Sequence, residues 1–257
     1  MLRLIVANTE LEIADAQRVR FRVYCEEEHL LPFHIAADGR ERDVRDLAET
    51  TTHLLVYAGT EPVGTVRLCL ASTRSPEKPG FGLDLEASFA LLGFDTPGMR
   101  LAEITRYCVV RRMRGTRVAS ALFAALHVTS QRLGVTHWVA AANMETDCAE
   151  DAAIAHRLIQ TSDLLSPVFA ASPRACAGPA AAKRFSYTPE ERQRARRGEL
   201  SLLKLPRTLS LFAHKLGARY LGAPAYDAHF NVFAAPLSVE LANISAQAKD
   251  ASGHASA

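Results

Sequence analysis

The chain has 257 residues, of which 48% are hydrophobic and 23% are charged, a composition typical of a globular protein. Its formal net charge of +2 is too small to indicate a nucleic-acid-binding protein, although basic residues cluster locally. The five cysteines show no Cys-x-x-Cys spacing, which favours reduced thiols over disulfides or a zinc site. Neither a signal-peptide pattern nor a run of about 18 apolar residues occurs, so we expect a cytoplasmic location.

The first half of the chain alternates between the apolar spacings of strands and of helices. A hairpin is the clearest feature, because two β-rich runs flank the turn sequence Gly-Thr-Glu-Pro. The predicted elements are a strand over 2–7, a helix over 15–24, a polar loop over 34–52, hairpin strands over 53–59 and 63–71, a loop over 73–80 and a strand over 102–110.

The second half begins with a helix that we expect to start in the Arg-rich stretch from Arg111 and to run to about Leu133, where Gly134 ends it. The elements predicted after it are a strand over 136–144, a helix over 149–164, a loop over 170–189, a charged helix over 189–197, a partly apolar helical region over 200–222 and a strand over 229–237. An Ala- and Ser-rich tail over 241–257 is predicted to be disordered. Without repeats or a linker, we expect one domain, with a core over 1–145 and an elaboration over 146–240.

The stretch over 111–123, RRMRGTRVASALF, gathers four arginines around one glycine at the expected helix start. Backbone amides, the helix dipole and guanidinium groups together predict an anion site there. A solvated helix start with surface arginines explains the same pattern equally well. The motifs GxxxxGK[ST] and GxGxxG are absent, which excludes a nucleoside-triphosphate loop and a dinucleotide fingerprint.

Residues 112–119, RMRGTRVA, resemble the [RQ]xxGx[GA] loop of the GNAT acyltransferase superfamily. In that superfamily the loop follows a strand, opens a helix and holds the phosphates of coenzyme A. Arg117 stands where the motif usually has Gly or Ala, and a side chain of that size would crowd a pyrophosphate. The resemblance therefore implies an acyl donor with a single phosphate, such as phosphopantetheine on a carrier protein.

Four separated segments resemble the acyl-homoserine-lactone synthases, a GNAT branch that takes acyl chains from acyl carrier protein. In chain order they are RFRVY over 20–24, ERDVRD over 41–46, Arg67 within VGTVRL, and EITRY over 103–107. That branch usually carries a tryptophan after its first motif. This chain has HLLPFH there and only Trp138 elsewhere, which argues against a homoserine-lactone product.

Four segments are similar to the ornithine-lipid and N-acyl amino acid synthases, N-acyltransferases that depend on acyl carrier protein. They are RVRFRVYCEE over 18–27, which exosortase-associated acyltransferases share, HLLVYAG with PVGTVRL within 53–68, LAEITRYCVVRRMRG over 101–115, and above all the segment over 205–237. The resemblance covers roughly 18–237. It implies an α/β (α+β) GNAT fold, with a mixed, mostly antiparallel sheet flanked by helices and a C-terminal helical extension. The implied reaction transfers a fatty acyl chain from acyl carrier protein to the α-amine of an amino acid.

The expected site follows from these motifs and from the chemistry of amide formation. Glu103 is placed to take the amine's proton, unless it forms a structural ion pair with Arg106 or Arg67. The aspartates of the 41–46 segment would grip the amino acid, or else form a salt-bridged cap with Arg20 that orders the 34–52 loop. The candidate residues are Glu103 and Arg106 for catalysis; Arg20, Tyr24, Asp43, Asp46, Arg67 and Thr105 for substrate; and Arg112, Arg114, Gly115, Thr116 and Arg117 for the carrier phosphate.

Other features are assigned simpler roles. The histidines show no metal-ligand spacing, and Cys108 is interpreted as a small buried filler. We expect no metal, no tightly bound cofactor and no nucleic acid, with acyl-CoA as the alternative donor. The region over 200–222 either packs on the core or makes transient contact with the inner membrane. The rival functions are an autoinducer synthase, a coenzyme-A-dependent acetyltransferase and a non-catalytic carrier- or lipid-binding module on a GNAT scaffold.

Overall fold

The computed structural model describes residues 1–32, 38–72, 77, 80–174 and 178–244. The chain divides into two compact units, and each is described by itself. Unit 1 comprises residues 1–83 and 101–135, and unit 2 comprises residues 84–100 together with the chain from 136 onward. Among the described residues, no helix is both long and apolar enough to cross a membrane.

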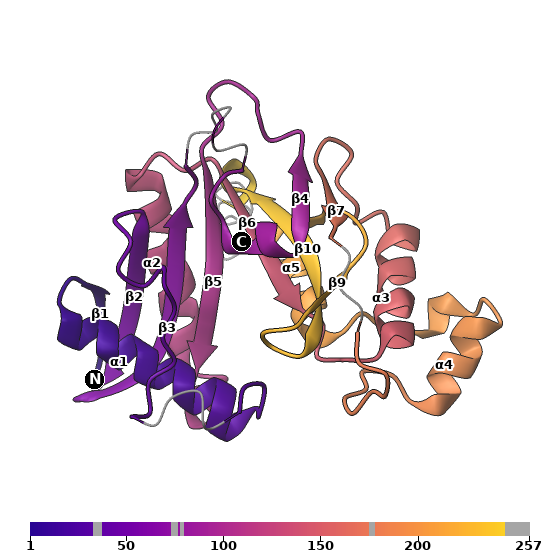
Figure 1. The fold of residues 1–257 in the computed structure, drawn as a ribbon, viewed down its shortest axis with the longest axis horizontal. Helices are drawn as coiled ribbons and strands as arrows, with labels where there is room; N and C mark the ends of the chain where they lie inside the picture. Colours follow the sequence, from indigo (N-terminus) through magenta and orange to yellow (C-terminus); the bar gives the residue numbers. More distant parts are fainter. Residues whose placement is uncertain (33–37, 73–76, 78–79, 175–177, 245–257) are drawn as a thin grey trace, which may run out of the picture. The chain divides into compact units, whose positions relative to one another are not determined.

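Unit 1 is built on four antiparallel strands in the order β1-β2-β3-β5 (Figure 1). The strands are β1 (Leu2–Ala7), β2 (Thr51–Ala58), β3 (Glu61–Leu70) and β5 (Leu101–Val109). All four were predicted to within two residues. The hairpin turn is shorter than expected, because Gly59 takes a φ of +65° and Glu61 and Pro62 already belong to β3.

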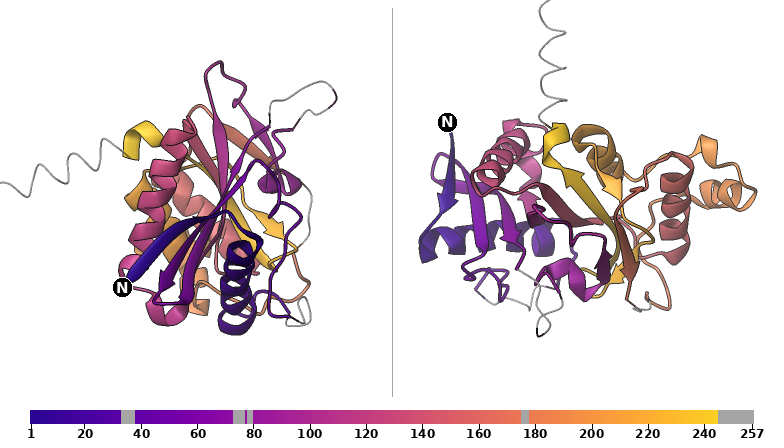
Figure 2. Two further views of the ribbon diagram at one scale, coloured as in Figure 1. Left: turned by 90° about the vertical axis from the view of Figure 1, so that its left-hand side faces the viewer. Right: turned by 90° about the horizontal axis from the view of Figure 1, so that it is seen from above.

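Two helices cover opposite faces of this sheet (Figure 2). The first, α1 (Glu10–Phe21), begins five residues before the predicted start, because Thr9 and Glu12 form a capping box. A π-helical turn over Arg22–Glu27 continues it. The second, α2 (Arg117–Arg132), begins later than predicted, at the N-cap Thr116.

The late start of α2 has a local cause. Gly115 adopts a φ of +78°, a left-handed conformation that cannot continue a helix, so the preceding residues Arg111–Met113 form only a separate 3-10 turn. The predicted end is correct, since Gly134 has a φ of +69° after the last turn.

The apolar core of unit 1 lies between its sheet and α2. Leu54, Val66 and Leu68 are buried, and α2 contributes Val118, Leu122 and Leu126 at helical spacing. Gly64 is the point of closest approach, because a Cβ built there would lie 2.6 Å from a methyl carbon of Val118 and 3.2 Å from one of Leu122. A side chain at residue 64 is therefore incompatible with the position of α2.

The described part of unit 2 contains a second antiparallel group of strands and three α-helices. Central strand β10 (Val232–Glu240) pairs with β6 (His137–Asn143), with the short β8 (Arg219–Tyr220) and with β9 (Ala225–Asp227). The helices are α3 (Ala149–Thr161), α4 (Pro189–Arg196) and α5 (Arg207–Leu216), and a separate pair of strands joins β4 (Phe89–Leu92) to β7 (Ala170–Pro173).

Three sequence predictions for unit 2 are corrected. The predicted loop over 170–189 contains β7, whose backbone pairs with β4 despite its Ala- and Pro-rich composition. The predicted helical region over 200–222 contains a 3-10 turn, α5 and β8, because Pro206 and the left-handed Gly217 bound the helix. Leu241 in the predicted tail is buried, while residues 245–257 lie outside the described chain.

Substitution of Gly64 by alanine tests the packing of α2 on β3. We expect the added methyl group to lower the free energy of unfolding by about 1–3 kcal/mol through overpacking against Val118. Urea denaturation followed by circular dichroism measures the change. In the Gly64→Ala, Val118→Ala double variant the lost valine methyls make room, so the combined cost should be smaller than the sum of the single costs. Strict additivity would contradict the contact.

Candidate functional site

A polar face of the unit 1 sheet forms the candidate site. His53, Arg67 and Thr105 lie opposite one another on β2, β3 and β5, on the face covered by α1. Arg20 reaches this face from α1, and the segment over 41–46 lies across it through side-chain contacts. The side chains of Arg20 and Arg67 have no exposed surface, so both positive charges must be neutralised by neighbours.

Arg20 is held by two carboxylates. Its Nη1 and Nη2 donate to the two oxygens of Asp46 at 2.8 and 2.7 Å, a bidentate geometry that suits the planar guanidinium. Its Nε donates to Glu41 Oε2 at 2.5 Å, and Nη2 also donates to the backbone carbonyl of Glu41. Gln17 donates to Asp46 Oδ2 as well, at 2.9 Å, so both Asp46 oxygens are fully used.

Arg67 and Arg106 extend the same network. Arg67 Nη1 lies 3.0 Å from Asp43 Oδ1 and 3.1 Å from Asp46 Oδ1, while its Nε donates to the Thr105 hydroxyl at 2.8 Å. Arg106 donates to Asp43 Oδ2 at 2.7 Å and to Glu41 Oε1 at 3.2 Å. We call the six charged residues of this network the charge cluster: Arg20, Glu41, Asp43, Asp46, Arg67 and Arg106.

The charge cluster pairs three guanidinium groups with three carboxylates, so its formal charge is balanced. Burial alone would raise the pKa of Asp46, but its hydrogen bonds with Arg20 and Gln17 outweigh burial and lower that pKa well below its usual value. The pKa of Asp43 is also lowered, because the Arg45 amide and the charges of Arg67 and Arg106 outweigh its burial. The neighbouring arginines therefore keep Asp43 and Asp46 in their ionised forms.

Arg106 reaches the charge cluster from a β-bulge. The register between β3 and β5 shifts after Thr65, and Arg106 has a φ of +54°, which is unfavourable for a residue with a side chain. Its neighbour Tyr107 points to the other face, where it stacks on Phe123 with ring centroids 4.8 Å apart. The bulge thus directs two consecutive side chains to different partners.

Glu103 lies two residues before Thr105 on β5, on the same face of the strand, and its side chain is 2% exposed. Tyr24 and Cys108 are both buried, and their side chains interact electrostatically with each other and with Arg106. Burial raises the pKa of Cys108 to about 12 and raises that of Tyr24 well above its usual value. The Cys108 thiol therefore stays protonated at neutral pH and is a poor nucleophile.

The arginine-rich loop over 111–117 meets an acidic segment of the π-helical turn. Arg114 donates to Glu28 at 2.7 Å and to Glu27 at 3.4 Å, and the backbone amide of Arg111 donates to Glu27 at 2.7 Å. Arg112 pairs with Glu61 at the start of β3. These ion pairs are largely exposed, so each contributes little to stability.

The remaining loop residues stay open to solvent. The Arg117 side chain makes no hydrogen bond or ion pair with any residue that the structure describes. A Cβ at Gly115 would meet nothing within 4 Å. The Thr116 hydroxyl donates to the Met113 carbonyl at 2.6 Å and accepts from the Val118 amide, which fixes the start of α2.

The structure therefore brings the predicted residues together in two groups. The five loop residues lie beyond the end of β5. The other group lies on the α1 face and consists of Arg20, Tyr24, Asp43, Asp46, Arg67, Glu103, Thr105 and Arg106. The segment from Arg20 to Glu28 joins them, because its first residue enters the charge cluster and its last pairs with the loop. Among the described residues, no group of His, Cys, Asp or Glu is arranged to hold a metal ion.

Sequence reasoning missed three residues of the charge cluster and its surroundings. Glu41 belongs to the quoted ERDVRD segment, but its role as the partner of both Arg20 and Arg106 was not predicted. Gln17 lies one helical turn before Arg20, a spacing that could have indicated a shared partner. His53 is buried, and its Nε2 lies 3.0 Å from the Asp46 carbonyl oxygen. Burial lowers the pKa of His53, which keeps the ring neutral.

Two comparisons of the sequence with known proteins both match proteins named for the N-acylation of amino acids. Residues 15–146 match the family described as N-acyl amino acid synthase FeeM. An L-ornithine N(alpha)-acyltransferase from Brucella abortus (strain 2308) is 32% identical over 129 residues, which are 48% of this chain. The match spans 45% of that relative, less than half of its length.

Two solved structures show a similar fold. The N-acyl amino acid synthase FeeM from uncultured soil microbes has a TM-score of 0.50 at 13% identity, over 96% of this chain and 94% of that one. BjaI, a coenzyme-A-dependent acyl-homoserine lactone synthase, also has a TM-score of 0.50, at 20% identity over 94% of this chain and 83% of that one. The predicted fold class, a mostly antiparallel sheet flanked by helices, is confirmed.

Replacing Asp46 by asparagine tests the charge cluster. We expect a loss of about 3–5 kcal/mol in the free energy of unfolding at neutral pH, because Arg20 and Arg67 lose a buried counter-charge. The lowered pKa of Asp46 stabilises the fold above the usual carboxyl pKa of 3.8, and this contribution disappears as the pH falls below that value. The difference from wild type should therefore shrink on acidification.

Urea unfolding at a series of pH values measures this dependence. The matched control is Glu49→Gln, which removes a carboxylate from an exposed residue of the same loop and should change stability little. An Asp46→Asn variant as stable as the control at neutral pH would contradict the assigned role.

Proposed function

This chain belongs to the N-acyl amino acid synthase family, and from that premise we propose that it is an N-acyltransferase that moves a fatty acyl chain from acyl carrier protein to the α-amine of an amino acid. The observation that supports this most directly is the position of Glu103, which lies on β5 two residues before Thr105, the partner of Arg67, on the sheet face that carries the charge cluster. In a direct transfer the amine nitrogen attacks the thioester carbonyl carbon, the C–N bond forms and the C–S bond breaks. The phosphopantetheine thiolate then takes up a proton as it leaves.

Glu103 acts in this proposal as the base that receives the amine's proton, directly or through water. Its carboxylate is almost fully buried, which limits competition from solvent. No acyl-enzyme is required, and the raised pKa of Cys108 fits a reaction without a cysteine nucleophile.

Some residues of the charge cluster are buried and hold the 41–46 segment in place, and others are partly exposed and can contact a substrate. Arg20 and Asp46 are buried and use their polar atoms on each other and on Glu41 and Gln17, so they fix the 41–46 segment rather than bind substrate. Asp43 and Arg106 retain exposed side-chain fractions of 15% and 9%. We assign to Asp43 the substrate ammonium and to Arg106 the substrate carboxylate.

The 111–117 loop binds the donor. One phosphopantetheine phosphate contacts the open Gly115 amide and the unpaired Arg117, while the exposed pairs of Arg112 and Arg114 with glutamates exchange partners at little cost. Acidic residues of the carrier protein meet the same arginines.

The Glu103→Gln variant tests the base. We expect kcat to fall by about 10²–10⁴-fold with a smaller change in KM for the amino acid, because the amide retains shape but cannot accept the proton. Mass spectrometry of products formed from long-chain acyl carrier protein and a pool of amino acids gives the rates. Thermal unfolding of the same variant serves as a control for structural damage. An unchanged kcat would remove Glu103 from the mechanism.

The Arg117→Ala variant tests the donor site. KM for acyl carrier protein should rise by about tenfold with kcat preserved, because one charged hydrogen bond to the phosphate is lost. Arg132→Ala, at the exposed end of the same helix, removes an equal charge and should leave KM unchanged. If acetyl-CoA served as well as long-chain acyl carrier protein, the proposed donor would be wrong.

A further inference from the structure

A groove beside α5 in unit 2 combines apolar walls with unpaired positive charges. Its volume is about 640 Å³. We call it the α5 groove; its lining residues are Ser162, Leu164, Lys204, Leu205, Arg207, Ser210, Leu211, His214 and Lys215. None of these residues is a carboxylate, although Asp163 lies between two of them in the sequence.

Helical periodicity explains how α5 builds one wall of the groove. Leu209 and Ala213 are buried and attach the helix to the rest of unit 2. Arg207, Leu211 and Lys215 follow one another at intervals of four residues, so they share the exposed face. Leu211 is 44% exposed within this face, and Leu202, in the 3-10 turn before the helix, is 62% exposed.

The cations of the α5 groove differ from two exposed arginines at the end of α4. On and beside α4, Arg196 pairs with Glu150 at 2.7 Å, and Arg197 pairs with Glu199 at 2.8 Å. By contrast, no described residue forms an ion pair with the side chains of Lys204, Arg207 or Lys215. The groove therefore carries an uncompensated positive charge over an apolar surface.

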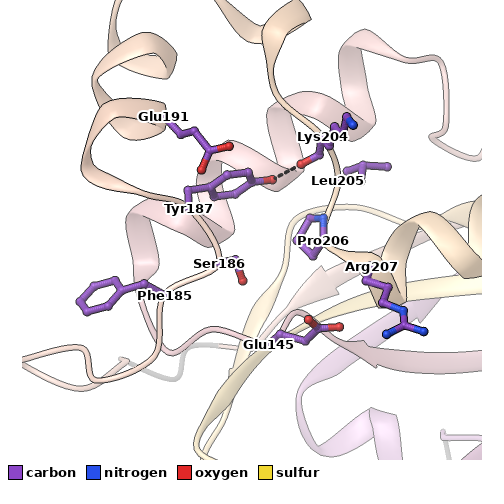
Figure 3. A pocket seen from close by; sticks show the side chains of 9 residues that line it. All are labelled: Glu145, Phe185, Ser186, Tyr187, Glu191, Lys204, Leu205, Pro206 and Arg207. Carbon is purple, nitrogen blue, oxygen red and sulfur yellow. Dashed lines mark hydrogen bonds between the residues drawn. The ribbon is translucent and has the colours of Figure 1, made fainter. Parts of the chain in front are cut away.

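A neighbouring hollow shows where the basic surface ends. It has a volume of about 350 Å³, shares Lys204, Leu205 and Arg207 with the α5 groove, and adds the carboxylates of Glu145 and Glu191. In Figure 3 the Arg207 side chain lies on the side of Glu145, whereas Lys204 points away from Glu145. Glu145 is itself occupied, accepting from the Thr208 hydroxyl at 2.5 Å. The charge of Glu145 therefore weakens the positive potential of Arg207 more than that of Lys204, which points away from it, or that of Lys215, which does not line this hollow.

We propose that the α5 groove docks unit 2 on an anionic membrane surface, with lipid phosphates against Lys204 and Lys215 and with Leu202 and Leu211 entering the interface. Unpaired lysines beside exposed leucines, on a short amphipathic helix and in the turn just before it, are a combination that binds such surfaces. A zwitterionic ligand would need a carboxylate in the lining, and the α5 groove has none. This inference does not depend on the proposed acyl transfer.

Vesicle co-sedimentation of the full chain tests the proposal. Wild type should bind vesicles containing phosphatidylglycerol, bind pure phosphatidylcholine weakly, and dissociate as salt increases. The Lys204→Gln, Lys215→Gln double variant should lower the partition coefficient on the order of 30-fold. The matched control, Arg196→Gln with Arg197→Gln, removes the same charge from paired positions at the end of α4 and directly after it, and should bind like wild type.

A second variant, Leu202→Ser with Leu211→Ser, should weaken binding in a way that high salt does not reproduce, because it removes apolar area rather than charge. Two results overturn the proposal. Either the wild-type protein does not bind anionic vesicles, or the Arg196→Gln, Arg197→Gln control loses as much binding as the lysine double variant. Unchanged vesicle binding with a raised KM for acyl carrier protein would instead assign the groove to an acidic protein. Vesicle binding requires no catalysis, so its failure and that of the proposed function are distinguishable.

Discussion

The polar face of unit 1 depends on one constraint, the complete neutralisation of buried guanidinium groups. Arginine stays protonated at any pH relevant to a protein, so Arg20 and Arg67, with no exposed surface, require carboxylates within the fold. The 41–46 segment supplies these carboxylates. As a result, its carboxylates are largely buried while its apolar side chain is exposed. Asp46 is buried, while Val44 within the segment and Leu47 directly after it are 98% and 73% exposed. Ion pairing, and not hydrophobic burial, therefore holds this segment on the sheet.

Under the proposed function, this constraint also decides which residues can contact a substrate. Asp46 cannot release Arg20 without leaving a buried charge, so the pair behaves as fixed scaffolding. Asp43 and Arg106 lie at the edge of the charge cluster, and the bulge at Arg106 sets the direction of that guanidinium. A strained backbone at a residue with a functional side chain is common in binding sites, because the surrounding structure must over-determine the conformation. The interlocked cluster provides that support.

Much of the fold could be predicted from sequence, because strands such as β2 and β3 are rich in β-branched and other apolar residues and have a Gly turn between them. Eight of the candidate residues lie on the α1 face of the sheet, whereas the five residues of the 111–117 loop form a separate group beyond the end of β5. The sequence did not predict the ion pairs. Glu41 pairs with both Arg20 and Arg106, and Glu27 and Glu28 pair with Arg114 of the 111–117 loop. Such partners lie 21 to 87 residues apart, and no local pattern records which charges meet. Strand β7 was missed for the same reason, since only its pairing with β4 makes it a strand.

The two basic surfaces of the chain differ in a way that follows from their partners. In the 111–117 loop Arg112 and Arg114 already face glutamates, so their net field is weak and only a ligand with matching geometry gains by displacing those carboxylates. Arg117 adds one unpaired charge at a defined place. The α5 groove has the opposite character, because Lys204 and Lys215 are uncompensated and their field extends over about a Debye length. Paired arginines thus suit a specific phosphate, whereas unpaired lysines beside exposed leucines suit a surface whose charges are many and mobile.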